Sequence, residues 1–205
     1  MRPLRVGVLA SGAGTNLQAI LDRVHRHAAE VVAVGANRAD ARALERAAAA
    51  GVPTAVFALD DHGGDREARD AAMAEWLADR GAELVVLAGY MQLVTPGFLA
   101  AFPDRVINVH PALLPAFAGV RAIEQALDYG VKVFGVTVHF VDEGVDSGRI
   151  ISQRAVELPA ATEPSEVHAS LRPLEHELLC EAIALIARGA VRPDPGHPRR
   201  VIVAE

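Results

Sequence analysis

Two polar side chains close a short apolar run near the middle of the chain. Asn108 and His110 alternate with apolar neighbours in Val106-Ile107-Asn108-Val109-His110-Pro111. Side chains two residues apart in a strand point to the same face, so the amide and the imidazole are expected on one side. An amide and a protonated imidazole could together stabilise the oxyanion that develops during acyl transfer. The alternative is an Asn and a His that only satisfy loop backbone, and these two residues alone leave both interpretations open.

An acidic loop lies between two strand-like runs. It reads Asp142-Glu143-Gly144-Val145-Asp146-Ser147-Gly148. A carboxylate near His110 would favour the protonated imidazole. Composition does not choose between Asp142, Glu143 and Asp146, and acidic turn residues commonly only solvate a loop. His139, which alternates with Val138 and Phe140, is interpreted as a structural histidine.

A glycine-containing loop follows the first predicted strand. Leu4–Ala10 runs into Ser11-Gly12-Ala13-Gly14-Thr15-Asn16, after which a helical pattern begins. Backbone N–H groups at a helix N-terminus stabilise anions, and glycines allow close approach. A dinucleotide site is disfavoured because Leu17 stands where the third glycine of that motif belongs. The loop favours a monophosphate site; the alternative is a tight turn capped by Thr15 or Asn16.

Composition excludes several classes of protein. The 205 residues are 51% hydrophobic and carry a net charge of −6, which argues against a nucleic-acid-binding protein. One cysteine, Cys180, excludes an intramolecular disulfide and a zinc site built from several thiolates. No apolar run reaches about 18 residues, and the N-terminus lacks a signal-peptide pattern. We therefore expect a cytoplasmic protein with no metal, no nucleic-acid partner and no membrane partner.

The elements that must position these residues alternate between strands and helices. The sequence predicts strands at Leu4–Ala10, Val31–Gly35, Leu84–Leu87, Arg105–Val109 and Val131–Phe140. It predicts helices at Thr15–His27, Ala39–Ala50, Asp65–Arg80 and Glu163–Arg188. This alternation is typical of an α/β fold with a mostly parallel, twisted sheet and helices on both faces.

Two further expectations concern the C-terminal part. Pro173 lies inside the last predicted helix, and an interior proline costs about 3 kcal/mol. We therefore expect a kink or break near Leu171–Pro173. The Pro- and Arg-rich tail, residues 191–205, is expected to lie on the surface.

Four stretches in order carry a resemblance to a known family. The chain resembles the phosphoribosylglycinamide formyltransferases over about residues 4–188, and the pattern Asn-x-His-Pro-x-Leu-Leu-Pro is specific to 10-formyltetrahydrofolate-using formyltransferases. The stretches are Ser11-Gly-Ala-Gly-Thr-Asn-Leu-Gln-Ala-Ile20, Ala88-Gly-Tyr-Met91, Ile107-Asn-Val-His-Pro-Ala-Leu-Leu-Pro115 and Val138-His-Phe-Val-Asp-Glu-Gly-Val-Asp-Ser-Gly148.

The resemblance implies a role for each matching residue. It makes Asn108, His110 and Asp146 the catalytic residues. It assigns substrate binding to Gly14, Thr15, Asn16, Arg172 and Glu175. Folate binding falls to Arg66, Met91, Gln92, Leu93, Val94, Asn108, Asp142, Glu143, Gly144, Val145 and Asp146. The implied substrates are glycinamide ribonucleotide and 10-formyltetrahydrofolate, the latter as co-substrate.

The resemblance also implies a single-domain Rossmann-like formyltransferase fold. Its domain would span 1–190, with a phosphate-binding half (about 1–100) and a folate and catalytic half (about 101–190), before the tail at 191–205. A cis peptide is expected at Leu114–Pro115, and a homodimer is one possible assembly. The chain departs from the family pattern at Ala118, Arg121, Arg149 and Pro173, which concerns loop shape and affinity rather than the catalytic residues.

Three alternatives remain at this point. A formyltetrahydrofolate hydrolase would be expected to carry an N-terminal regulatory domain, whereas the first predicted strand here begins at Leu4. A methionyl-tRNA formyltransferase would need a C-terminal tRNA-binding domain. A non-catalytic module that senses a phosphorylated ligand would bind without turnover.

Overall fold

A computed structural model describes residues 2–204. The chain forms two compact units, Met1–Asn108 and Val109–Glu205, and the boundary between them falls inside one strand. No helix of the described part is long and apolar enough to cross a membrane.

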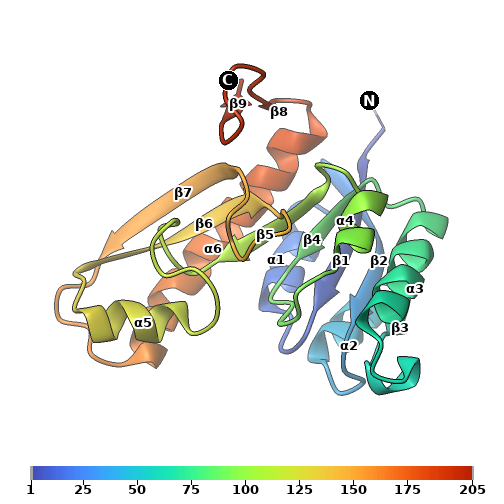
Figure 1. Ribbon diagram of the computed structural model, residues 1–205, viewed down its shortest axis with the longest axis horizontal. Helices are drawn as coiled ribbons and strands as arrows, with labels where there is room; N and C mark the ends of the chain where they lie inside the picture. Colours follow the sequence, from blue (N-terminus) through green and yellow to red (C-terminus); the bar gives the residue numbers. More distant parts are fainter. Residues whose placement is uncertain (1, 205) are drawn as a thin grey trace. The chain divides into compact units, whose positions relative to one another are not determined.

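The N-terminal unit is built on parallel strands (Figure 1). Their order is β3-β2-β1-β4-β5, and each adjacent pair is parallel. All four residues of β4 are buried, as expected for a strand covered on both faces. The strands are β1 (Leu4–Ala10), β2 (Ala29–Ala36), β3 (Thr54–Val56), β4 (Leu84–Leu87) and β5 (Val106–His110).

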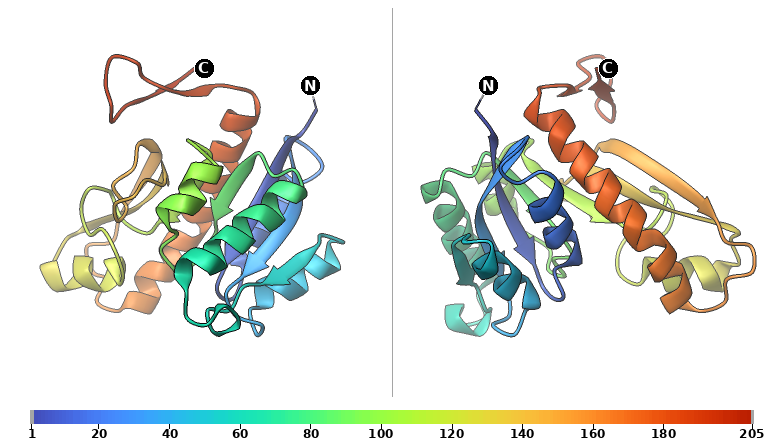
Figure 2. Two further views of the ribbon diagram at one scale, coloured as in Figure 1. Left: turned by 45° about the vertical axis from the view of Figure 1, so that its right-hand side comes forward. Right: turned by 180° about the vertical axis from the view of Figure 1, so that it is seen from behind.

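Two pairs of helices cover this sheet. Helices α1 (Thr15–Arg23) and α2 (Arg42–Ala49) pack together, and so do α3 (Arg66–Asp79) and α4 (Pro96–Ala101). The two pairs lie on opposite faces of the sheet (Figure 2). A short turn of 3₁₀ helix, η1 (Asp60–His62), precedes α3. The crossovers bring the loops that follow β1 and β4 to the carboxyl ends of neighbouring strands, where open α/β sheets bind ligands.

The C-terminal unit is an antiparallel hairpin with two helices. Strands β6 (Val133–Phe140) and β7 (Ile150–Glu157) pair antiparallel, and α6 (Pro164–Ala187) packs on both. Helix α5 (Ala122–Tyr129) contacts α6. A small second hairpin, β8 (Val191–Pro193) with β9 (Val201–Val203), follows α6.

The α/β class with mostly parallel strands is confirmed, and β1 and β4 have the predicted bounds. The expected cis peptide at Leu114–Pro115 is also confirmed. Helices α1 and α2 are shorter than predicted. The strand-like run expected after the acidic loop is β7. Strand β3, helices α4 and α5 and the β8–β9 hairpin were not predicted from the sequence.

Of the kink or break expected near Leu171–Pro173, the break is wrong. Helix α6 continues from Pro164 to Ala187 as one element with Pro173 inside it. Pro173 and Ala169, whose carbonyl loses its helical donor, are both exposed, so water can bond that carbonyl. Buried side chains before and after the proline, including Leu171 and Leu178, hold both halves of the helix on the hairpin.

Candidate active site

The acidic loop between β6 and β7 closes tightly on itself. At its base the Phe140 N–H donates to the Arg149 carbonyl at 2.9 Å. A Cβ at Gly148 would overlap the Phe140 carbonyl oxygen, so this close approach requires glycine. Asp146 has a left-handed backbone, with φ of 49°. The loop thus turns back so that Asp146 lies beside the strand that enters it.

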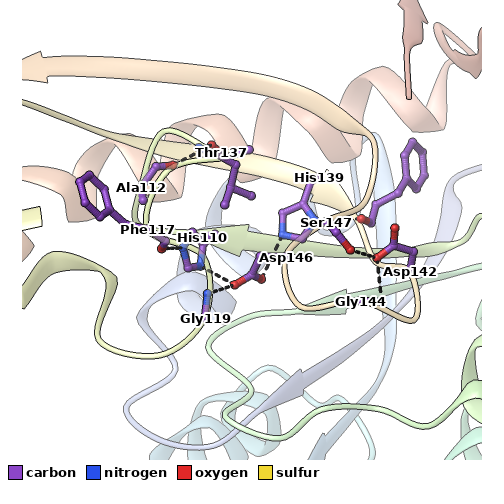
Figure 3. A network of polar contacts seen from close by, with 12 residues as sticks. His110, Ala112, Phe117, Gly119, Thr137, His139, Asp142, Gly144, Asp146 and Ser147 are labelled. Carbon is purple, nitrogen blue, oxygen red and sulfur yellow. Dashed lines mark hydrogen bonds and ion pairs between the residues drawn. The ribbon is translucent and has the colours of Figure 1, made fainter. Parts of the chain in front are cut away.

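The carboxylate of Asp146 is the centre of a polar network (Figure 3). Its Oδ2 lies 3.3 Å from His110 Nδ1 and accepts a 2.8 Å hydrogen bond from the Gly119 N–H. Its Oδ1 lies 3.5 Å from His139 Nε2. Of the acidic candidates, Asp146 is therefore the one beside His110. Asp142 instead accepts hydrogen bonds from the Gly144 N–H and the Ser147 hydroxyl within its own loop.

His110 is held at both ring nitrogens. Its side chain is 6% exposed, and Nε2 lies 2.9 Å from the Phe117 carbonyl oxygen, opposite the contact of Nδ1 with Asp146. Both neighbours are acceptors, and the charged imidazolium satisfies them together because it carries hydrogen on both nitrogens. The arrangement therefore suits a cationic His110 whose ring is fixed in orientation.

The pKa of Asp146 reflects competing causes. Burial of the carboxyl raises its pKa, but the hydrogen bonds from His139 and Gly119, together with the charges of His110 and His139, lower it by more. The net result is a pKa below the ordinary 3.8. Asp146 is therefore an ionised carboxylate at neutral pH and an acceptor for the two imidazoles that face it.

The glycine loop after β1 ends in a helix N-terminus. Gly14 is the N-cap of α1 with a left-handed backbone, φ 67° and ψ 32°, and a glycine has no side chain with which to cap the helix. The first amides of α1 lack helical acceptors, which makes them donors for an anion.

Helix α2 holds the same loop from the side. The Ala43 N–H donates to the Gly12 carbonyl at 3.1 Å, and Arg46 Nε donates to the Ala13 carbonyl at 2.9 Å. A Cβ on Gly14 would lie 2.7 Å from the Ala43 Cα. The loop is thus fixed before any ligand binds, and glycine is required at position 14.

The segment 91–94, between β4 and α4, lies beside the glycine loop. The Met91 N–H donates to Ser11 Oγ at 2.8 Å, and Arg66 Nη2 donates to the Leu93 carbonyl at 2.8 Å. Met91 is 72% exposed and Leu93 57% exposed. Apolar side chains exposed on an anchored backbone are typical of a ligand-contacting surface.

The remaining predicted residues lie in β5 and on α6. Asn108 lies in β5, two residues before His110, and is half-buried. Glu175 is a buried carboxylate on α6, one turn after Arg172, which is exposed and contacts His168 Nδ1 at 3.1 Å. Within residues 2–204, no group of three or more His, Cys, Asp and Glu side chains is arranged to hold a metal ion.

Sequence reasoning missed one member of the network. His139 was interpreted as structural, yet its Nε2 faces Asp146 while its Nδ1 lies 2.8 Å from the Phe140 carbonyl. The signal was present in the loop length, since a loop closing between Phe140 and Arg149 returns its later residues to the strand end. Sequence reasoning likewise missed Arg46, whose contacts with the glycine loop join residues distant in the chain.

Comparisons with known proteins agree with this arrangement. Residues 4–183 match the family described as formyl transferase. A phosphoribosylglycinamide formyltransferase of Mycobacterium tuberculosis strain H37Rv is 44% identical over 190 residues, covering 92% of this chain and 87% of that protein. The crystal structure of glycinamide ribonucleotide transformylase 1 from Symbiobacterium toebii matches with a TM-score of 0.94 at 47% identity, covering 99% of this chain and 95% of that one.

A formyltetrahydrofolate deformylase is also similar. The protein from Pseudomonas syringae pv. tomato matches with a TM-score of 0.89 at 26% identity. The match covers all of this chain and 67% of the deformylase.

Proposed function

This chain belongs to the formyl transferase family, and we propose that it transfers the formyl group of 10-formyltetrahydrofolate to the amine of glycinamide ribonucleotide. The products are the formylglycinamide ribonucleotide and tetrahydrofolate, in a step of purine biosynthesis. The observation that carries this proposal is the ion pair between His110 Nδ1 and Asp146 Oδ2, 3.3 Å apart and largely buried. It supplies a fixed, positively charged donor of the kind that acyl transfer requires.

The chemistry follows from charge development on the formyl group. The substrate amine attacks the formyl carbon, a new C–N bond forms, and negative charge builds on the formyl oxygen. The Asn108 amide and the imidazolium of His110 donate to that oxygen. Collapse breaks the bond to the folate nitrogen, which takes up the proton that the amine loses. Losing one such donor typically costs about 10²–10³ in rate.

Asp146 has two roles in this scheme. Its carboxylate keeps His110 charged, and it can hold a water that carries the proton from the amine to the leaving nitrogen. Help of that kind contributes roughly 10²–10⁴ in rate. His110 Nε2 lies 2.9 Å from the Phe117 carbonyl oxygen, so donation to the formyl oxygen requires Nε2 to exchange that partner for substrate.

Binding of the two substrates is assigned to the remaining residues. Gly14, Thr15 and Asn16 would bind the phosphate through backbone and side-chain donors, with Arg172 and Glu175 toward the ribonucleotide. Arg66, segment 91–94 and the 142–146 loop would hold the folate. The exposure of Met91 and Leu93 supports a contact with an apolar ring system.

The first experiment follows loss of 10-formyltetrahydrofolate by absorbance, with and without glycinamide ribonucleotide. Rapid loss only with the ribonucleotide supports the transferase. Equal loss in both reactions would establish a hydrolase, the activity named for the Pseudomonas relative. No loss in either would leave a binding module.

Two variants test the catalytic assignment. His110→Ala removes the charged donor, and Asp146→Asn removes the charge that holds it. Each should lower turnover at least about tenfold while the protein stays folded, because an oxyanion donor or its orienting partner is lost. Near-normal turnover in either variant would refute the assignment.

Compartment, assembly and domain organisation complete the proposal. A single buried cysteine, Cys180, is consistent with a reducing cytoplasm. We propose a homodimer as the assembly, and light scattering on the purified protein, which measures its molar mass, tests it. The division into a phosphate-binding half and a folate and catalytic half remains a proposal, to be tested by binding each substrate to variants of each half.

A further inference from the structure

A buried ion pair on α3 has no part in the chemistry described above. Arg69 and Asp70 are both 0% exposed, and Arg69 Nε donates to Asp70 Oδ1 at 2.8 Å. Arg69 Nη2 lies 2.7 Å from the same oxygen. Charged residues are almost never fully buried unless they are paired, because taking a charge out of water is costly. Such a pair therefore calls for a structural or functional reason.

Both members of the pair reach the same short segment. The second oxygen of Asp70, Oδ2, accepts a 2.7 Å hydrogen bond from the Thr95 N–H. Arg69 Nη1 donates to Gln92 Oε1 at 3.2 Å. Gln92 lies within segment 91–94, and Thr95, the N-cap of α4, directly follows that segment. The pair thus holds the segment in its middle and, through Thr95, at its C-terminal end.

The segment that Arg69 and Asp70 hold carries exposed apolar side chains. Met91 and Leu93, on either side of Gln92, are 72% and 57% exposed. A loop with outward apolar side chains gains little burial of its own, so its backbone must be ordered by other contacts. Ordering it before the ligand binds reduces the conformational entropy lost on binding.

We propose that Arg69 and Asp70 are positioning residues that preorganise segment 91–95 for the formyl-folate co-substrate. They set its KM without touching it. This inference rests on the proposed function, because the identity of the ligand on the segment comes from there. That the pair orders the segment rests on the hydrogen bonds from Arg69 to Gln92 and from the Thr95 N–H to Asp70, whatever the ligand is.

Arg69→Lys is the main test. A lysine keeps the positive charge beside Asp70 but lacks the guanidinium fork that reaches both Asp70 and Gln92. We expect the KM for 10-formyltetrahydrofolate to rise about tenfold, the size expected for one lost hydrogen bond to a charged group. The KM for glycinamide ribonucleotide and kcat should change by no more than about twofold, since uniform binding of one substrate is what is lost.

A second readout needs no substrate. Amide hydrogen exchange of the ligand-free protein should become at least about tenfold faster in residues 91–95 of the Arg69→Lys variant, because local opening becomes easier. Exchange at residues 15–20 of α1 should not change. Asp70→Asn leaves one acceptor oxygen for the two donors that Asp70 serves, Arg69 and the Thr95 N–H, and it removes the charge that pairs the buried Arg69. It should therefore raise KM and exchange at least as much as Arg69→Lys.

Leu77→Ala is the matched control for stability. Leu77 is fully buried on the same helix and packs near Gly7. Its truncation should lower the free energy of unfolding without changing the folate KM or exchange at 91–95. Unchanged exchange at 91–95 in Arg69→Lys, or an equal rise of KM in Leu77→Ala, would overturn the proposal. Wild-type protein without ribonucleotide-dependent activity would instead overturn the proposed function, while the exchange result still decides whether the pair orders the segment.

Discussion

His139 Nε2 lies 3.5 Å from Oδ1 of Asp146, the oxygen opposite the one that faces His110. The side chain of His139 is 2% exposed and comes from the end of β6, just before the loop that carries Asp146. Asp146 is therefore fixed from both sides. A carboxylate bonded through both oxygens cannot rotate away from His110 without losing a partner, so His139 orients the ion pair that the proposed chemistry requires.

Replacing His139 tests this orientation. His139→Phe removes both ring nitrogens, so Oδ1 of Asp146 loses its donor. A hydrogen bond to a charged group contributes about 1.5–3 kcal/mol, so kcat should fall roughly ten- to hundredfold. The KM values of both substrates should change little. Steady-state kinetics measures both quantities, and His27→Phe, at an exposed position, is the control. A variant with full kcat would show that Asp146 needs no second partner.

The pH dependence of stability should show the lowered pKa of Asp146. Because that pKa lies below the ordinary 3.8, the folded state favours the ionised carboxylate. The resulting stabilisation is fully present above pH 3.8 and is lost as the pH falls through the lower, folded-state pKa. Wild type should therefore exceed Asp146→Asn in free energy of unfolding at pH 6, and the gap should close in acid.

Urea denaturation of both proteins between pH 7 and about pH 2.5 measures this gap. The groups that face Asp146 are the side chains of His110 and His139 and the Gly119 N–H, and all three are present in both proteins. A gap that stays constant over this range, or widens in acid, would contradict the lowered pKa.

Gly14 should tolerate no side chain. Its φ of 67° is strained for an L residue, by roughly 1–2 kcal/mol, and a Cβ would lie 2.7 Å from the Ala43 Cα. Gly14→Ala should therefore lower the free energy of unfolding by more than about 2 kcal/mol, the sum of strain and overlap. Gly12→Ala is the control, because a Cβ at position 12 meets nothing within 4 Å. Equal stabilities of the two variants would show that the loop adapts.

Elements and loops set by residues close together in the sequence could be predicted, whereas features set by contacts between distant residues could not. β1 and the glycine loop are local, because a β-branched run followed by small residues identifies them directly. The bounds of β7 were not predicted, because Ile150–Glu157 carries exposed polar residues on an open face and lacks a long apolar run. Composition left Asp142, Glu143 and Asp146 as equal candidates, and only the family resemblance pointed to Asp146. The burial of Arg69 was not predicted, since it depends on contacts between residues far apart in the chain. The break at Pro173 was wrongly expected because the cost of one lost helical hydrogen bond was weighed without the packing of α6 on the hairpin.

The C-terminal hairpin contacts the loop that carries Asp146, and the contact involves a departure from the family pattern. Arg149 Nε donates to the Pro198 carbonyl at 2.9 Å, and Arg199 Nη1 donates to the Ser147 carbonyl at 3.2 Å. Arg149→Ala should therefore speed amide exchange in residues 141–148 and lower kcat about two- to tenfold, the size of an ordinary hydrogen bond. Arg192→Ala, exposed on β8, is the control. If Arg149→Ala leaves both exchange and kcat unchanged, the hairpin only covers the surface and does not support the loop.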